Sequence, residues 1–201
     1  MMKTASDVSV KKALGWAAAV VGIFLVTRAV FRELGKYDLR GKVVLITGGS
    51  RGHGLVLARE LAGKGARLAI CARSADKLEL ARQELQRSGA EVLALPADIT
   101  DKVQAAAMVR DVIDYYGSLD VVINNAGIIQ VGPQESMDLT DYEKAMQINF
   151  WAALYIIRAA LPYFMEKGEG RIVNITSIGG KIAVPHLLPY TASKFALVGF
   201  S

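Results

Sequence analysis

From Val43 onward, short apolar runs alternate with longer stretches in which apolar positions recur every three or four residues. Five runs are apolar enough to be covered on both faces, as the strands of a parallel sheet are: Val43–Thr47, Arg67–Cys71, Glu91–Leu95, Asp120–Ile123 and Arg171–Ile175. Helical spacing separates them, for example at Leu78/Ala81/Leu85 and at Val109/Val112/Ile113/Tyr116. Strands that alternate with helices pair in parallel through right-handed crossovers. The pattern therefore predicts an α/β fold with a doubly wound, Rossmann-type parallel sheet over residues 41–201.

A long helix is expected before the fifth strand. Thr140 followed by Glu143 has the spacing of a capping box. The helical pattern then continues through Trp151 and Tyr155 toward Lys167.

A separate apolar segment occupies residues 1–40. No charge occurs from Ala13 to Thr27, and apolar residues continue after Arg28 as far as Phe31. As a helix, residues 13–31 would be about 28 Å long, close to the ~30 Å hydrocarbon core of a bilayer. We therefore expect a membrane anchor and a basic linker, with a cleaved signal peptide or a helix packed on the domain as alternatives. Basic residues after the run outnumber those before it, which favours a domain that faces the cytoplasm.

The net charge of +5 lies in the first 42 residues, which hold eight Lys and Arg against three acidic residues. The remaining residues hold 16 basic and 16 acidic side chains, so the predicted domain is neutral. Nucleic-acid binding needs a basic face, and none is expected here. The single cysteine, Cys71, excludes an intrachain disulfide and is interpreted as a small buried hydrophobe. No metal site is predicted.

A glycine-rich turn, Thr47-Gly48-Gly49-Ser50-Arg51-Gly52-His53-Gly54, follows the first strand and leads straight into the helical segment Leu55–Lys64. In such a strand, turn and helix, backbone N–H groups and the positive end of the helix receive a pyrophosphate. Glycines let the phosphate approach the backbone. The turn therefore predicts a dinucleotide site.

The second strand ends at Cys71-Ala72-Arg73-Ser74, about 20 residues beyond the glycines, where an NAD-binding domain places an acid on the ribose 2′-hydroxyl. Here Arg73 stands beside that place, and Arg51 lies inside the glycine turn. Both could pair with a 2′-phosphate. The sequence therefore predicts NADPH/NADP+ in preference to NADH, with solvated surface arginines as the alternative.

Further motifs follow along the chain and end with Ser177 and Tyr190-x-x-x-Lys194. The serine precedes the tyrosine by 13 residues. With the glycine turn, Asp98, Asn124-Asn125-Ala126-Gly127 and Asn149, these motifs resemble the short-chain dehydrogenase/reductase family from about Lys42 to the end of the chain. The resemblance implies a catalytic tetrad of Asn149, Ser177, Tyr190 and Lys194. It also implies a cofactor site in which Asp98 contacts the adenine and Asn125–Gly127 line the ribose. The full set of implied cofactor residues is Thr47, Gly48, Ser50, Arg51, Gly52, Gly54, Arg73, Asp98, Ile99, Asn125, Ala126, Gly127, Tyr190 and Lys194.

Tyr190 and Lys194 are four residues apart on a predicted helix, so their side chains share one face. Carbonyl reduction needs a proton donor for the oxygen, and an ammonium beside a tyrosine favours proton release from the phenol. Ser177 would hold the substrate oxygen, and Asn149 would connect a water chain to Lys194. The predicted function is NADPH-dependent interconversion of a carbonyl and an alcohol with Tyr190 as the acid/base. Each of these residues could instead have a structural role.

Both histidines lie near the predicted site. His53 replaces the aliphatic residue usual in the family, and it is either a neutral imidazole packed on the cofactor or a pH-sensitive contact. His186, before the catalytic helix, either faces the substrate or is a rigid loop residue. The family's arrangement implies a mostly apolar substrate pocket of Ile128, Ile129, Gln130 and residues 178–183. With the anchor, this pocket suggests a lipophilic carbonyl such as a fatty, sphingoid, steroid or retinoid compound.

The chain stops at Ser201, within the helix of Tyr190 and Lys194. Members of the family continue through further strands and a segment that closes over the substrate. We therefore expect a fragment of a longer protein or a truncated product. The early stop leaves an alternative function, a non-catalytic, membrane-tethered dinucleotide-binding or interaction protein. The resemblance also implies a homo-oligomer when the protein is full length.

Overall fold

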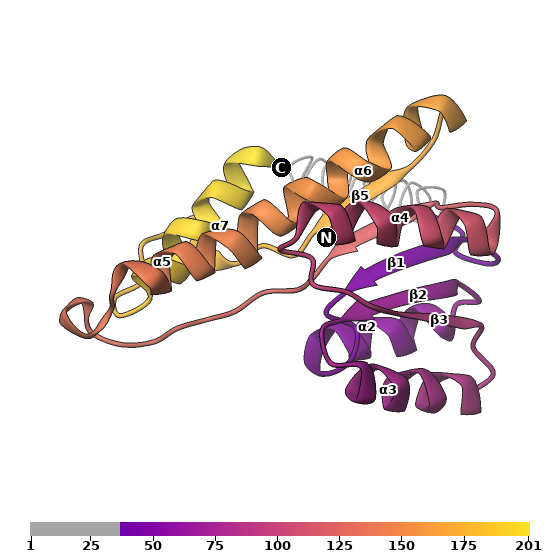
Figure 1. The fold of residues 1–201 in the computed structure, drawn as a ribbon, viewed down its shortest axis with the longest axis horizontal. Helices are drawn as coiled ribbons and strands as arrows, with labels where there is room; N and C mark the ends of the chain where they lie inside the picture. The colour runs from indigo at the N-terminus through magenta and orange to yellow at the C-terminus, as the bar shows by residue number, and fades with distance from the viewer. Residues whose placement is uncertain (1–36) are drawn as a thin grey trace, which may run out of the picture. The chain divides into compact units, whose positions relative to one another are not determined.

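The computed structural model describes residues 37–201, of which Leu39–Ser201 form one compact unit. The predicted anchor, residues 13–31, lies outside the described residues. Five parallel strands form one sheet in the order β3-β2-β1-β4-β5 (Figure 1), which confirms the predicted doubly wound α/β fold. Each strand agrees with its prediction within one residue at either end: β1 (Val43–Thr47), β2 (Arg67–Ala72), β3 (Val92–Pro96), β4 (Val121–Asn124) and β5 (Arg171–Asn174).

Helices cover both faces of the sheet. Figure 1 shows α2 (Gly52–Ala62) and α3 (Ala75–Arg87) on one face, and α4 (Lys102–Tyr116) and α6 (Ala152–Lys167) on the other. Every residue of β1 is buried. Because successive strand residues point to opposite faces, β1 contributes to the packing on both sides. The remaining elements are α5 (Leu139–Met146), the π-helix η2 (Gln147–Trp151), α7 (Leu188–Phe200) and the 3-10 turns η1 (Gln134–Ser136) and η3 (Ile178–Gly180).

The largest core cluster lies between the sheet and helices α4 and α6. Val43 and Leu45 of β1 meet Met108 of α4 and Ile156 of α6 there, and all four side chains are at most 2% exposed. Tyr116 closes the cluster, and its hydroxyl donates to the carbonyl of Leu68 at 2.8 Å. The predicted helical positions of α3 and α4 are confirmed, since Leu78, Ala81, Leu85, Val109, Val112 and Tyr116 are buried.

The long helix before β5 begins two residues earlier than expected. The predicted capping box of Thr140 and Glu143 is wrong, because Asp138 is the N-cap and Asp141 completes the box with it. Asp138 has extended backbone and its carboxylate accepts from the Asp141 N–H at 3.2 Å, whereas Thr140 already lies inside the helix. The helix then runs without a break from Leu139 to Lys167, as the pattern predicted.

Leu139–Lys167 is also the one helix among residues 37–201 that is long and apolar enough to cross a bilayer. Many of its apolar side chains pack inside the domain. Ala152, Ile156, Ala160 and Phe164 are buried in the core cluster between α4 and the sheet. The place of this helix in the core therefore accounts for part of its hydropathy, while Leu161 and Met165 remain exposed.

The amino edge of the sheet is held by an ion cluster around Asp120, just before β4. The buried carboxylate accepts from Lys167 at 2.6 Å, from Lys42 at 3.2 Å and from the Val43 N–H at 2.8 Å. Burial alone would raise the pKa of Asp120, but these hydrogen bonds together lower it below its ordinary value. The cluster joins the start of β1 to the end of α6 and leaves the opposite, carboxyl edge for the functional side chains.

Candidate active site and cofactor cleft

The glycine turn between β1 and α2 has backbone that only glycine adopts without strain. Gly48 and Gly52 have positive φ values of 69° and 56°. A Cβ at Gly54 would lie 2.3 Å from the Gly48 carbonyl oxygen and 2.6 Å from Asn125 Nδ2. Arg51 is the N-cap of α2, and its side chain makes no capping hydrogen bond. The first N–H groups of α2 are therefore left for an anion, and this cradle fits the pyrophosphate of a dinucleotide.

A cleft of about 810 Å³ extends from this turn across the carboxyl ends of the strands. Eleven of the predicted cofactor residues line it: Gly48, Ser50, Arg51, Gly52, Gly54, Arg73, Asp98, Ile99, Asn125, Ala126 and Gly127. The strands that contribute them are neighbours in the sheet, so residues far apart in sequence meet at one edge.

Thr47 does not line the cleft, but it makes hydrogen bonds to residues that do. Its buried hydroxyl accepts from the N–H groups of Asn125 at 3.0 Å and Ala126 at 2.9 Å. Its carbonyl accepts from Asn125 Nδ2 at 2.9 Å. These three bonds fix the turn after β4 against the end of β1, so Thr47 is a positioning residue.

The cleft also includes residues that the motifs did not identify. Lys77 lines it one helical turn after Arg73, and both side chains are exposed. With Arg51, three cations therefore line the cleft, against the one carboxylate of Asp98. The signal available in the sequence was that Lys77 lies in the first turn of α3, close along the chain to Arg73.

Asn149 sits in the π-helix η2 and is 1% exposed. Its Oδ1 accepts from the Ile128 N–H at 2.9 Å, and its Nδ2 donates to the Ile128 carbonyl at 3.0 Å and to Ser193 Oγ at 2.9 Å. Ser193, which the sequence analysis did not identify, donates in turn to the Tyr190 carbonyl at 2.7 Å. Asn149 therefore ties the loop after β4 to the helix that carries Tyr190.

Lys194 is 4% exposed and its ammonium donates to the Ile175 carbonyl at 2.7 Å. Burial lowers the pKa of Lys194 from its ordinary value. Its Nζ lies 5.8 Å from the centre of the Tyr190 ring, so the predicted pair does share one face of α7. The ammonium also lies beside Gly127, where a Cβ would be 3.8 Å from Nζ and 3.0 Å from Asn149 Oδ1.

Ser177 and Tyr190 meet at Gly179. A Cβ at Gly179 would lie 3.5 Å from Ser177 Oγ and 3.3 Å from Tyr190 Cε1. Ser177 Oγ accepts from the Gly179 N–H at 3.1 Å. The structure thus brings the four predicted catalytic residues together, around Gly127 and Gly179. Thr47, Tyr190 and Lys194 are the predicted cofactor residues that do not line the cleft itself.

The predicted substrate pocket lies on two loops that are connected by one hydrogen bond between backbone groups. The Gly132 N–H donates to the His186 carbonyl at 2.9 Å, and His186 has a positive φ of 62° that is unusual for a residue with a side chain. Ile129, Ile178 and Ile182 expose 58%, 67% and 55% of their surface. The two loops follow the carboxyl ends of β4 and β5, and both carry exposed apolar side chains.

A dinucleotide cradle beside a tyrosine–lysine pair is the arrangement of a nicotinamide-dependent oxidoreductase. Residues 42–201 match the family model described as short chain dehydrogenase, and the chain belongs to this family.

Relatives in the family include the dehydrogenase/reductase SDR family protein 7-like of Anopheles gambiae, which is 35% identical over 90% of this chain and 59% of its own length. The 11-beta-hydroxysteroid dehydrogenase 1A of Arabidopsis thaliana is 37% identical over 88% of this chain and 51% of its own length. The chain thus spans a little more than half the length of these two relatives. Among solved structures, a metagenomic short-chain oxidoreductase in complex with NADP is 34% identical, with a TM-score of 0.76 over 82% of this chain and 75% of that one.

Proposed function

We propose that this protein interconverts a carbonyl and an alcohol with NADPH/NADP+, and that Tyr190 is the acid/base. One observation carries the proposal: the Lys194 ammonium lies beside Gly127, which lines a cleft that fits a dinucleotide, and Lys194 faces the ring of Tyr190, which meets Ser177 at Gly179. Neither the cleft nor the three side chains alone would distinguish a reductase from a binding protein.

The residues divide the chemistry among them. When bound, the dinucleotide supplies a hydride to the carbonyl carbon, or accepts one from the alcohol. Ser177 Oγ donates a hydrogen bond to the substrate oxygen, and the Tyr190 hydroxyl transfers a proton to that oxygen. The Lys194 ammonium, 5.8 Å from the ring centre, stabilises the phenolate that this transfer leaves behind.

After Tyr190 has given up its proton, a new proton reaches it through a water beside Lys194. Ile128 and Ser193 use both N–H groups of Asn149, but among residues 37–201 the Oδ1 atom accepts a single hydrogen bond. An amide oxygen has two lone pairs, so Oδ1 can accept a second bond from a water beside Lys194. Asn149 is then a positioning residue for that water as well as for the loop after β4.

The preference for NADPH is supported by the charges of the cleft. Arg51, Arg73 and Lys77 surround the end of β2, where an acidic residue would be expected for NAD. An arginine pairs with a phosphate through two parallel hydrogen bonds, and a ribose hydroxyl offers no such partner.

A lipophilic substrate is supported by the exposed isoleucines of the two loops, Ile129, Ile178 and Ile182. The relative from Arabidopsis thaliana, named for a hydroxysteroid, is similar to this chain over nearly the whole domain. A membrane anchor at residues 13–31 would deliver such substrates from the bilayer. If the anchor exists, the protein sediments with membranes at high salt and its domain is digested by protease added to the cytoplasmic side.

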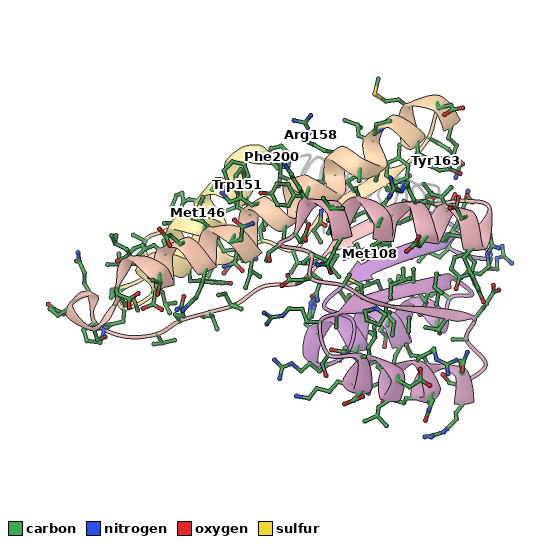
Figure 2. The ribbon with its side chains drawn as sticks, viewed as in Figure 1. Met108, Met146, Trp151, Arg158, Tyr163 and Phe200 are labelled. Carbon is green, nitrogen blue, oxygen red and sulfur yellow. The ribbon has the colours of Figure 1, made fainter. Side chains whose placement is uncertain are left out.

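Self-association of the full-length protein is a further part of the proposal. Trp151 of η2 and Phe200 of α7, both labelled in Figure 2, are each 40% exposed, and their elements pack against each other. Aromatic side chains on neighbouring helices are typical of subunit interfaces.

The cofactor preference is tested by titrating the protein with NADPH and NADH. We expect NADPH to bind at least about tenfold more tightly, and Arg73→Asp to lose about 2 kcal/mol of NADPH affinity while NADH affinity stays within about twofold. Arg110→Asp, an equal charge change on the exposed face of α4, is the control and should change neither value. An equal affinity for both cofactors in the unmodified protein would contradict the preference, and binding without turnover of any carbonyl would favour a non-catalytic role.

A further inference from the structure

His53 occupies a position of the cofactor cradle where an uncharged apolar residue is expected from the resemblance to the family. It is the second residue of α2, its side chain is exposed, and it lines the cleft next to the turn that fits a pyrophosphate. A histidine here changes the chemistry of the cradle, because imidazole can carry either no charge or one positive charge near neutral pH.

The protonation pattern of the neutral ring is determined by Asn125. The Asn125 amide donates to the Thr47 carbonyl at 2.9 Å, which leaves its Oδ1 facing His53 Nδ1 at 2.8 Å. An amide oxygen can only accept, so Nδ1 must carry the hydrogen. The neutral ring then has a bare Nε2, which has no hydrogen-bond partner among residues 37–201.

A bare Nε2 cannot bind a pyrophosphate, whose oxygens are also acceptors. Moving the hydrogen from Nδ1 to Nε2 would break the bond to Asn125. Protonation gives the ring a second N–H and keeps the first, so only the imidazolium can bond to Asn125 and to a phosphate oxygen together. A charge-assisted bond of this kind is also about twice as strong as a neutral one.

Charged groups face this region from each neighbouring element. They are Arg51 of the turn, Arg73 in the loop between β2 and α3, Lys77 of α3, Asp98 after β3, and Lys194 of α7, whose ammonium is bonded to the Ile175 carbonyl. A pyrophosphate brings two negative charges beside the ring. Binding and protonation therefore favour each other.

We propose that His53 is a pH-dependent ligand of the dinucleotide pyrophosphate, so that the cofactor binds more tightly as the pH falls from about 8 to about 6. The proposal rests on the dinucleotide site of the proposed function. It does not depend on the preference for a 2′-phosphate.

ADP-ribose is the probe that separates these two questions. It contains the pyrophosphate but has no 2′-phosphate, a monoester that would itself titrate near about pH 6. Calorimetric titration should give a dissociation constant about fivefold lower at about pH 6 than at about pH 8, since a charge-assisted bond replaces an unfavourable contact. At about pH 7, titrations in buffers of different ionisation enthalpy should also show net proton uptake on binding.

Two substitutions give matched controls. His53→Asn keeps an N–H donor at the Nδ1 position but cannot become charged, so the fivefold difference between the two pH values should vanish. His186→Asn removes the other histidine of the chain and suits the left-handed backbone there, so the difference should persist.

Three results would overturn the proposal: an affinity of the unmodified protein that does not change with pH, a pH dependence that persists in His53→Asn, or no binding of ADP-ribose at either pH. His53→Ile, with the aliphatic residue usual in the family, repeats the test if the asparagine variant does not fold. Arg73→Asp should keep the pH dependence toward ADP-ribose, so a failure of the NADPH preference is distinguishable from a failure of His53.

Discussion

The two halves of the carboxyl edge of the sheet perform their roles with different parts of the chain. The cofactor half is built around the glycine turn, a short stretch of sequence that offers backbone N–H groups, with side chains at the ends of β2 and β3 around it. The catalytic half offers side chains from three separate places, which are η2 with Asn149, the end of β5 with Ser177, and α7 with Tyr190 and Lys194. Asn149 alone bonds to residues 21 and 44 positions away. A backbone cradle is damaged by added atoms, whereas a side-chain cluster is damaged by removed ones.

The largest effect is expected from removing one atom in the catalytic half. Tyr190→Phe deletes the hydroxyl that we propose as the acid/base, and turnover should fall by about a thousandfold, within the range that acid–base catalysis contributes. Tyr190 does not line the cofactor cleft, so ADP-ribose should bind within about twofold of the unmodified protein. Steady-state rates and calorimetry measure the two quantities. Turnover near the normal rate in this variant would refute the role of Tyr190.

An added methyl group in the cofactor half should have the next largest effect. The Cβ of Gly54→Ala would lie 2.3 Å from the Gly48 carbonyl oxygen, so the turn must move. We expect a loss of about 2–3 kcal/mol in the free energy of unfolding, with ADP-ribose binding largely lost.

Gly52→Ala is the control, because its Cβ would meet no atom within 4 Å. For the free energy of unfolding, only its positive φ of 56° is unfavourable, at a cost of about 1 kcal/mol. Equal losses of the free energy of unfolding in the two variants would mean that backbone conformation limits the residue type in the cradle, rather than the close approach of the added Cβ to Asn125.

The smallest effect is expected from a change in the stability of the whole domain. Asp120 lies at the edge of the sheet opposite the site, so its loss should affect the cofactor half and the catalytic half equally. Its lowered pKa stabilises the native state above the unfolded-state pKa of about 3.9, and this contribution is lost as the pH falls through the lower native value. Because its lysine partners are partly exposed, Asp120→Asn should cost about 1–2 kcal/mol near neutral pH, between the values of surface and buried pairs, and less at about pH 3. Urea unfolding measures this in one transition. Asp111→Asn, on the exposed side of α4, should show no such dependence.

Much of this architecture was predictable because its signals are local. The strands were predicted within one residue, since a short apolar run between two helical stretches is typical of a buried parallel strand. The glycines were predicted for a related reason, because positive φ and close approach limit the residue type at single positions. Local signals also misled in one place: Asp138 and Asp141 match the capping pattern as well as Thr140 and Glu143 do, and only the backbone conformation of Asp138 decides between them.

By itself, then, the sequence determined the doubly wound sheet and the glycines of the cradle, and it predicted Asn149, Ser177, Tyr190 and Lys194 as the catalytic residues. Tertiary structure decided which contacts surround those residues. It assigned Thr47 to the support of Asn125, brought Lys77 into the cleft and placed Ser193 between Asn149 and Tyr190. It also directed His53 Nδ1 toward an oxygen 72 residues away. The physical reason is that propensity and periodicity depend on neighbours along the chain, whereas a hydrogen bond between distant residues depends on the packing of every element between them.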